Sequence, residues 1–176
     1  RVIIMDVFVE QIVKRRRTTG DIFKIALCVL AILLVLLATP MLLGIQFFGS
    51  IALLICVGLI YLLYNVLISV NLEYEYAFTN GALDVDKIIA ARRRKKLTDL
   101  NAREIEIMAK TSNLAYKNYA ENRDIKKIYA CTSPADEDVF FVVYLKESKK
   151  YMLLFNPDER IQDGFRRLNP QNVFLD

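Results

Sequence analysis

The stretch KIALCVLAILLVLLATPMLLGIQFFGSIALLICVGLIYLLYNVLISVNLE, which runs from Lys24 to Glu73, decides the fold. No charged residue lies between its two ends. A membrane-spanning helix needs about 20 apolar residues, so the stretch is too long for one span and has the right length for two. Lipid offers backbone groups no hydrogen-bond partner, so both spans are expected to be helical. We place them at residues 25–43 and 47–70, in a helical hairpin over residues 22–70.

The turn between the two spans is marked by Gly44 and Gln46, with Pro40 before them and Gly49 after them. Basic residues flank only the outer ends of the hairpin. They are Lys14, Arg15, Arg16, Arg17 and Lys24 before it, and Lys87, Arg92, Arg93, Arg94, Lys95 and Lys96 after it. Because Lys and Arg accumulate in cytoplasmic loops, both termini are expected in the cytoplasm and residues 44–46 outside the cell.

Three small residues, Gly49, Ala52 and Cys56, form a stripe along the second span. Small residues let membrane helices approach closely, so this stripe could form the face of a homo-oligomer. It could also pack on the first span of its own hairpin, and we favour this second interpretation.

Residues 1–21 are expected to form a basic amphipathic arm. Four apolar residues recur with helical spacing and precede the four basic residues at 14–17. They are Met5, Phe8, Val9 and Ile12. The pattern predicts a short helix, which either lies on the inner leaflet or docks on the C-terminal domain. Met5 is also a plausible initiator, because the sequence starts with an arginine.

Residues 71–176 are polar enough to form one small cytoplasmic domain. Residues 73–79, EYEYAFT, alternate strictly between polar and apolar, which is typical of a half-buried strand. Asn80-Gly81 is a strong hairpin signal, and Leu83 and Val85 begin the return strand.

Further strands are predicted at residues 104–108, 127–131, 139–145 and 151–155. Residues 109–125 are expected to be irregular, with Tyr116 and Tyr119 as anchors.

The end of the chain has the pattern of a helix. Asn156 is placed as its cap and Pro157 at its first position. Ile161, Phe165 and Leu168 form one apolar stripe along it. We therefore expect an antiparallel sheet of six or seven strands whose open end is covered by this C-terminal helix.

The order of these elements resembles that of the bacterial pleckstrin-homology-like (PH-like) membrane proteins. The stretches that carry the resemblance are residues 73–97 and 155–174. More narrowly, the chain is similar to an uncharacterised family of two-span proteins from Firmicutes. The resemblance implies a PH-like barrel or sheet capped by its C-terminal helix, in the bacterial cell membrane. It brings no catalytic residues.

The sequence contains no recognisable catalytic or metal-binding motif. There is no histidine, no nucleophile elbow and no phosphate-binding loop. Asp84 and Asp86 share one face of a strand, and residues 136–138 form an acidic loop, but both fit solvated surfaces better than cation sites. The cysteines, Cys28, Cys56 and Cys131, are most simply small buried residues. We expect neither an enzyme nor a cofactor or metal site.

The net charge of +4 is concentrated beside the apolar stretch, which argues against a nucleic-acid-binding face. The basic residues near the membrane are instead candidates for contact with anionic lipid. They are Arg92, Arg93, Arg94, Lys95, Lys96, Lys14, Arg15, Arg16 and Arg17. For the run at residues 92–96, the other interpretation is a solvated turn.

Three functions remain. The favoured one is a membrane-anchored PH-like module that binds a protein partner at the inner leaflet. The alternatives are a sensor of anionic lipid surfaces and an accessory subunit of a larger membrane complex, such as a transporter.

Overall fold

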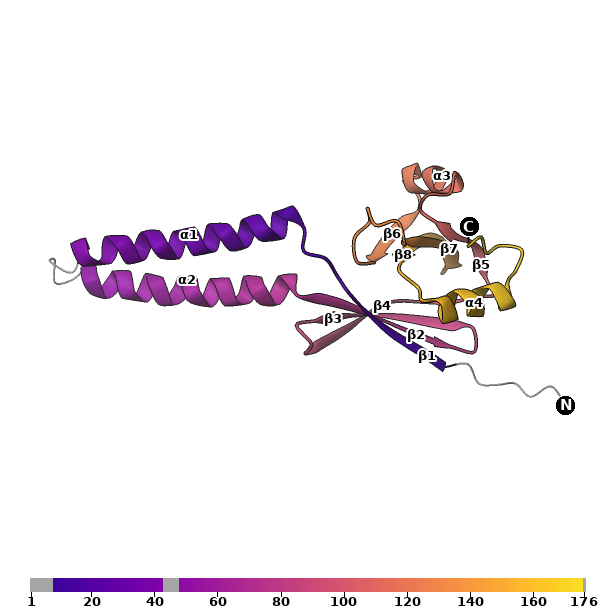
Figure 1. Cartoon of the computed structure of the whole chain (residues 1–176), viewed down its shortest axis with the longest axis horizontal. Helices are drawn as coiled ribbons and strands as arrows, with labels where there is room; N and C mark the ends of the chain where they lie inside the picture. The colour runs from indigo at the N-terminus through magenta and orange to yellow at the C-terminus, as the bar shows by residue number, and fades with distance from the viewer. Residues whose placement is uncertain (1–7, 43–47, 176) are drawn as a thin grey trace. The chain divides into compact units, whose positions relative to one another are not determined.

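The computed structural model describes residues 8–42 and 48–175 (Figure 1). The chain divides into two compact units. One contains residues 17–71, and the other combines the N-terminal segment up to Arg16 with everything from Leu72 onward.

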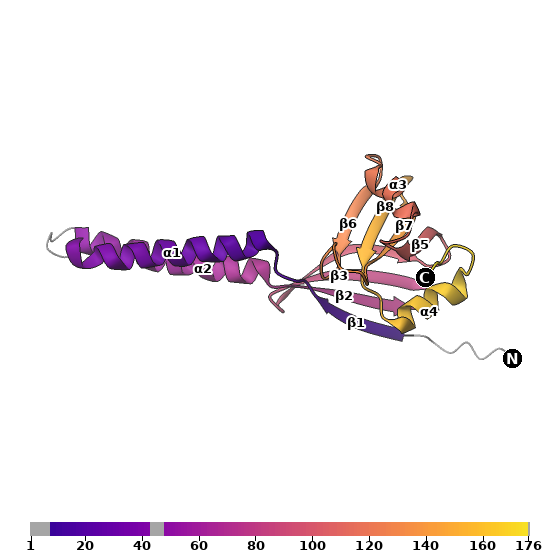
Figure 2. The same cartoon turned by 45° about the horizontal axis from the view of Figure 1, so that its top comes forward.

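The first unit is a pair of helices, α1 (Thr19–Leu42) and α2 (Phe48–Val70), that lie side by side (Figures 1 and 2). They confirm the two predicted helical segments, although α1 begins earlier than expected. Its start is fixed by reciprocal bonds: Thr18 N donates to Asp21 Oδ2 at 3.0 Å, and Asp21 N donates to Thr18 Oγ1 at 3.3 Å. The predicted turn at residues 44–46 lies outside the described residues.

Both helices are long and apolar enough to cross a membrane. Only 6% of the most apolar window of α1 is buried, and 11% of that of α2, whereas the core helix of a soluble protein is mostly buried. Ala52 and Cys56 are among the few buried side chains of α2. Their burial fits packing within one hairpin.

The first described element of the second unit is a strand where a helix was predicted, and Met5 of that predicted helix lies outside the described residues. Residues Phe8–Lys14 form β1, so the expectation of an amphipathic helix is wrong. Val9 and Val13 are buried while Phe8, Glu10, Ile12 and Lys14 are exposed, which is the two-residue alternation of a strand. Between them Gln11 also faces inward: its amide donates to Asn156 O at 2.9 Å and its oxygen accepts from Asp158 N at 2.8 Å. This polar residue on the inner face hid the alternation.

Sheet A contains β1, β2 (Leu72–Thr79), β3 (Ala82–Ile89) and β4 (Arg93–Asn101), in that order and all antiparallel. The Asn80-Gly81 turn is confirmed, with positive φ values of 51° and 98°. β1 and β2 are neighbours, and Lys14 lies opposite Glu73. The helical hairpin therefore takes the position in the chain that a short turn would occupy.

Sheet B contains β5 (Ile105–Lys110), β7 (Phe140–Lys146), β8 (Lys149–Phe155) and β6 (Lys126–Ala130), in that order. Contrary to the antiparallel expectation, β6 runs parallel to β8. No strand ladder joins sheets A and B among the described residues.

A short helix, α3 (Ala115–Glu121), replaces part of the predicted irregular segment. Tyr116 and Tyr119 act as the expected anchors, with ring centroids 5.4 and 6.0 Å from that of Phe141.

The last helix, α4 (Glu159–Leu168), joins the two sheets at one end of the core. Ile161 and Phe165 are fully buried, as predicted. The Phe165 ring lies 5.3 Å from Phe78 of sheet A and 6.2 Å from Phe155 of sheet B.

The cap of α4 differs from the prediction. Asp158, not Asn156, accepts from Ile161 N at 2.9 Å. The Asn156 side chain instead accepts from Thr132 N at 2.9 Å.

Candidate functional site

The basic run at residues 92–96 is mostly strand. The turn that precedes β4 is made by Ala90 and Ala91, whose φ values of 51° and 55° are left-handed, and Arg92 ends it. The interpretation of the whole run as a solvated turn is therefore wrong. It failed because consecutive charged residues conceal the alternation that identifies a strand.

Several predicted lipid-contact residues meet at one end of sheet A. Lys14 lies opposite Glu73, Glu73 opposite Ile88, and Ile88 opposite Arg94, so these residues form a row across four strands. In the next row Arg15 N donates to Leu72 O at 2.9 Å, and Ile89 lies opposite Arg93. This is the end of the sheet at which the chain leaves for α1 and returns from α2.

The other predicted lipid-contact residues are distributed differently. Arg16 Nη1 lies 3.1 Å from Asp136 Oδ1, and Arg17 belongs to the helical unit. Side chains alternate along β4, so Lys95 and Lys96 face opposite sides of the sheet, further from its end. The structure therefore does not gather all nine residues on one surface.

Arg94 also contacts a buried acid on the outer face of sheet A. Its Nη1 lies 3.1 Å from Glu75 Oε2, and Glu75 is only 5% exposed. Hydrogen bonding to the Glu10 carboxyl on β1, followed by burial, raises the pKa of Glu75, while Arg94 acts in the opposite direction.

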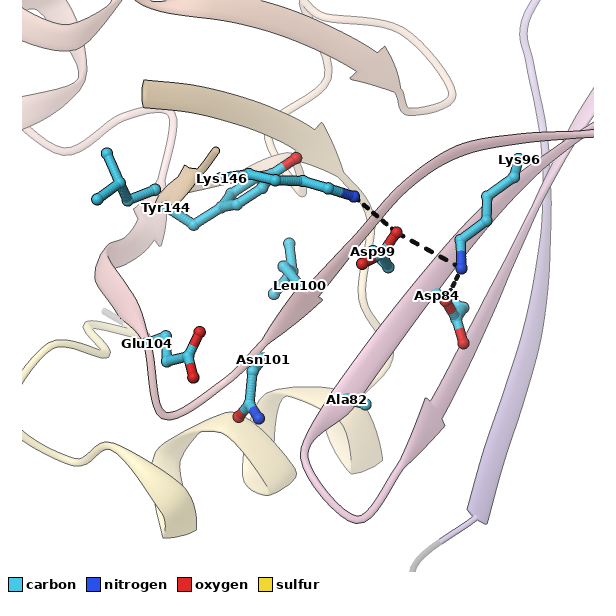
Figure 3. Close-up of a pocket in the computed structure, with 10 residues that line it drawn as sticks. Ala82, Asp84, Lys96, Asp99, Leu100, Asn101, Glu104, Tyr144 and Lys146 are labelled. Atoms are coloured by element: carbon cyan, nitrogen blue, oxygen red, sulfur yellow. Dashed lines mark hydrogen bonds and ion pairs between the residues drawn. The ribbon is translucent and has the colours of Figure 1, made fainter. Parts of the chain in front are cut away.

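A second group of charges lines a pocket of about 350 Å³ between β4 and the end of β7 (Figure 3). Lys146 and Lys96 approach Asp99 from opposite sides, with Nζ–Oδ1 distances of 2.7 and 3.5 Å. Lys96 Nζ also lies 2.7 Å from Asp84 Oδ1. The hydrogen bond from Lys146 is the main reason that the pKa of Asp99 lies below its ordinary value.

Sequence reasoning missed this network because it paired Asp84 with Asp86 along one strand. The partner of Asp84 is Lys96, which lies on the neighbouring antiparallel strand. An opposite charge on a neighbouring strand is the usual signal for such a pair, but it was hidden because β4 was not predicted as a strand. The contact with Lys146 joins two sheets and has no local signal.

Cys131 and Asp136 are two further candidates from the sequence. Burial raises the pKa of the Cys131 thiol to about 11, so it is a poor nucleophile at neutral pH. In the acidic loop, Asp136 accepts from Thr132 Oγ1 at 2.5 Å and pairs with Arg16. No cluster of three or more metal-ligating side chains occurs among residues 8–42 and 48–175.

Two four-stranded sheets with a C-terminal helix across one end of the core define a PH-like domain, here joined to an apolar helical hairpin. The chain belongs to the bacterial PH-like domain family DUF6106, whose model matches residues 5–175. The match includes the hairpin as well as both sheets. No curated protein and no solved structure matches the chain.

Proposed function

We propose that this protein spans the bacterial cell membrane with α1 and α2 and presents its PH-like domain to a protein partner at the inner leaflet. Both termini lie in the cytoplasm. The narrower kinship with two-span proteins of Firmicutes is part of the same proposal. The role is binding, with no catalytic step, cofactor or metal.

The observation that carries the proposal is the insertion of the hairpin between two paired strands. β1 and β2 are neighbours in one sheet, so the chain must leave and re-enter the domain at the same end. Only an even number of spans satisfies this requirement. Leu72 begins β2 two residues after α2 ends, so the domain has no long linker at this junction. A domain tethered through two strands is well suited to display a surface near the bilayer.

Site-specific photo-crosslinking in native membranes tests this function. A photoreactive residue replaces exposed Tyr129 of the PH-like domain in one variant and exposed Leu54 of α2 in another. We expect a protein adduct from the domain position. Adducts only from Leu54, together with a detergent-solubilised particle much larger than a 20.3 kDa chain or its dimer, would instead support an accessory subunit.

Contact with anionic lipid is the second candidate, because Lys14, Arg15, Arg93 and Arg94 meet at the end of sheet A from which the hairpin leaves. Each Lys or Arg at an anionic surface contributes about 1 kcal/mol, and the effect fades beyond a Debye length of about 8 Å. Amide exchange of the full chain, measured in anionic and in neutral nanodiscs, tests this contact with lipid.

The anionic discs should slow exchange around the β3–β4 turn relative to neutral discs. High salt, or replacement of Arg92, Arg93 and Arg94 by Gln, should remove the difference. Equal exchange in both kinds of disc would leave the protein-binding role alone.

A further inference from the structure

One groove of about 530 Å³ lies between the two sheets and is lined by strands at their edges. Among the strands that the structure describes, β4 pairs only with β3, and β6 pairs only with β8. Figure 2 shows β6 at the margin of its sheet, with no strand beyond it. We call this the β4–β6 groove. It is lined by residues 95–98, residues 126–129, Lys146, Glu147 and Tyr151.

The rim of the β4–β6 groove is basic. It contains five lysines and one acid, Glu147. Two of the lysines, Lys96 and Lys146, are already paired with the aspartates of the neighbouring pocket. The excess positive charge therefore comes from the other three, which are Lys95, Lys126 and Lys127.

These three lysines have no carboxylate partner among the described residues. Lys127 donates to the Ala120 carbonyl. The Lys126 Nζ lies 5.7 Å from the ring centroid of Tyr151, and Lys95 is exposed on β4. An incoming anionic group can therefore pair with them without breaking an ion pair.

The groove is apolar between its lysines. Leu97, Ile128 and Tyr151 are partly buried and pack against the main core. Tyr129 remains 51% exposed beside them. A ligand that is both acidic and apolar matches this lining better than a simple anion does.

We propose that the β4–β6 groove binds an extended acidic segment of the partner protein, which adds as a strand to an open sheet edge. This inference rests on the proposed function and names its site. Main-chain hydrogen bonds to β4 or β6 would fix the segment. Alternate side chains would pair with Lys95 and Lys126 or rest on the apolar floor.

Charge selects this occupant over a second copy of the chain. A symmetric dimer through the same edge would place lysines against lysines. Lysines on an edge strand also discourage unwanted pairing, and that role predicts no ligand at all.

Binding is measured with the full chain in neutral phosphatidylcholine nanodiscs and a fluorescent heptapeptide of alternating glutamate and valine. The charge-reversed double variant Lys95→Glu/Lys126→Glu should bind about tenfold or more weakly. Lys117→Glu/Arg123→Glu, at two exposed positions in and just after α3, changes the net charge equally and is the matched control, which should bind like the wild type. Rising salt should weaken binding.

Strand addition has a signature that simple charge attraction lacks. The peptide should slow amide exchange at residues 95–98 or 126–129, and a version with a central proline should fail to do so. No peptide binding, equal binding by the double variant, or equal protection by the proline peptide would overturn the proposal. Slower amide exchange at residues 95–98 or 126–129 in anionic nanodiscs without any peptide would also overturn it.

Crosslinking separates failure of the groove proposal from failure of the proposed function. The same photoreactive residue is placed at Tyr129 in the groove and at Ile12 on the far edge of sheet A, both exposed. A partner adduct from Tyr129 that disappears in the double variant supports the groove. An adduct from Ile12 alone keeps the partner-binding function and overturns the groove, whereas no adduct from any domain position removes both.

Discussion

The α1–α2 hairpin and the PH-like domain use apolar side chains in opposite ways. Along α1 and α2 most large apolar residues are exposed, for example Leu37 at 77% and Leu54 at 72%. In the domain, Phe78, Phe141 and Phe165 are at most 1% exposed. The difference supports the proposal that the hairpin lies in lipid, because an apolar surface that is costly in water is not costly in lipid.

Removal of β1 should give the largest loss of stability. This strand belongs to the PH-like domain, although the hairpin separates it from the rest of the domain in the sequence. A fragment of residues 72–176 lacks the strand that buries Val9 and Val13, and we expect it to lose about 3–6 kcal/mol of stability from those two side chains. A matched chain joins residues 8–14 directly to residues 73–175 through an Asn-Gly turn, since Lys14 lies opposite Glu73.

Chemical unfolding compares the two chains. The turn-joined chain should be soluble and cooperatively folded. Equal stability of the two would show that β1 is dispensable.

Phe165→Ala tests the core that joins the sheets. This ring is fully buried between Phe78 and Phe155, so its truncation should cost about 3–5 kcal/mol. Arg166→Ala, at the next and exposed position of α4, should cost little. The unfolding midpoints of both variants in detergent are compared with the wild type, and similar shifts would refute the packing of α4.

Leu30→Arg tests whether α1 of the hairpin contacts lipid. Leu30 lies near the centre of the apolar window of α1 and is 53% exposed. Arginine at the centre of a spanning helix raises the free energy of insertion by about 3–4 kcal/mol relative to leucine. The fraction of protein that resists alkaline extraction from membranes should fall, while Leu30→Phe should leave it unchanged. If Leu30→Arg is extracted no more easily than the wild type, α1 does not contact lipid.

Glu75→Gln should have the smallest effect and a particular pH dependence. The pKa of Glu75 is raised above the ordinary value of 4.5, so its contribution to stability is greatest below pH 4.5 and is lost as the pH rises through the raised pKa. The variant should be more stable than the wild type at neutral pH and should lack this loss.

Unfolding midpoints between pH 4 and pH 8 measure the effect of Glu75→Gln. Glu73→Gln, on the same strand, is the control. A variant less stable than the wild type at neutral pH would show that the contact with Arg94 outweighs the repulsion from Glu10.

The sequence predicted the elements whose side chains alternate or repeat regularly. β2, β3 and their Asn80-Gly81 turn were found because the apolar residues of this hairpin alternate. β1 was missed because Gln11 interrupts that alternation on the inner face. β4 was missed because its first four residues are all basic and only Leu97 and Leu100 show a pattern.

The candidate sites were harder to predict than the fold. The row that ends in Lys14 and Arg94 depends on β1 lying beside β2, across a separation of almost sixty residues. The contact of Asp99 with Lys146, and the meeting of β4 with β6 in one groove, depend on how two sheets pack. Neither relation leaves a local pattern in the sequence.

Cysteine accessibility in intact cells tests the two-span arrangement most directly. In a chain whose three cysteines are replaced by alanine, Gln46→Cys probes the predicted turn between the spans and Arg166→Cys probes the PH-like domain. We predict that a membrane-impermeant thiol reagent labels Gln46→Cys in intact cells, and labels Arg166→Cys only after the membrane is permeabilised. Labelling of Arg166→Cys in intact cells, with Gln46→Cys protected until permeabilisation, would contradict the account.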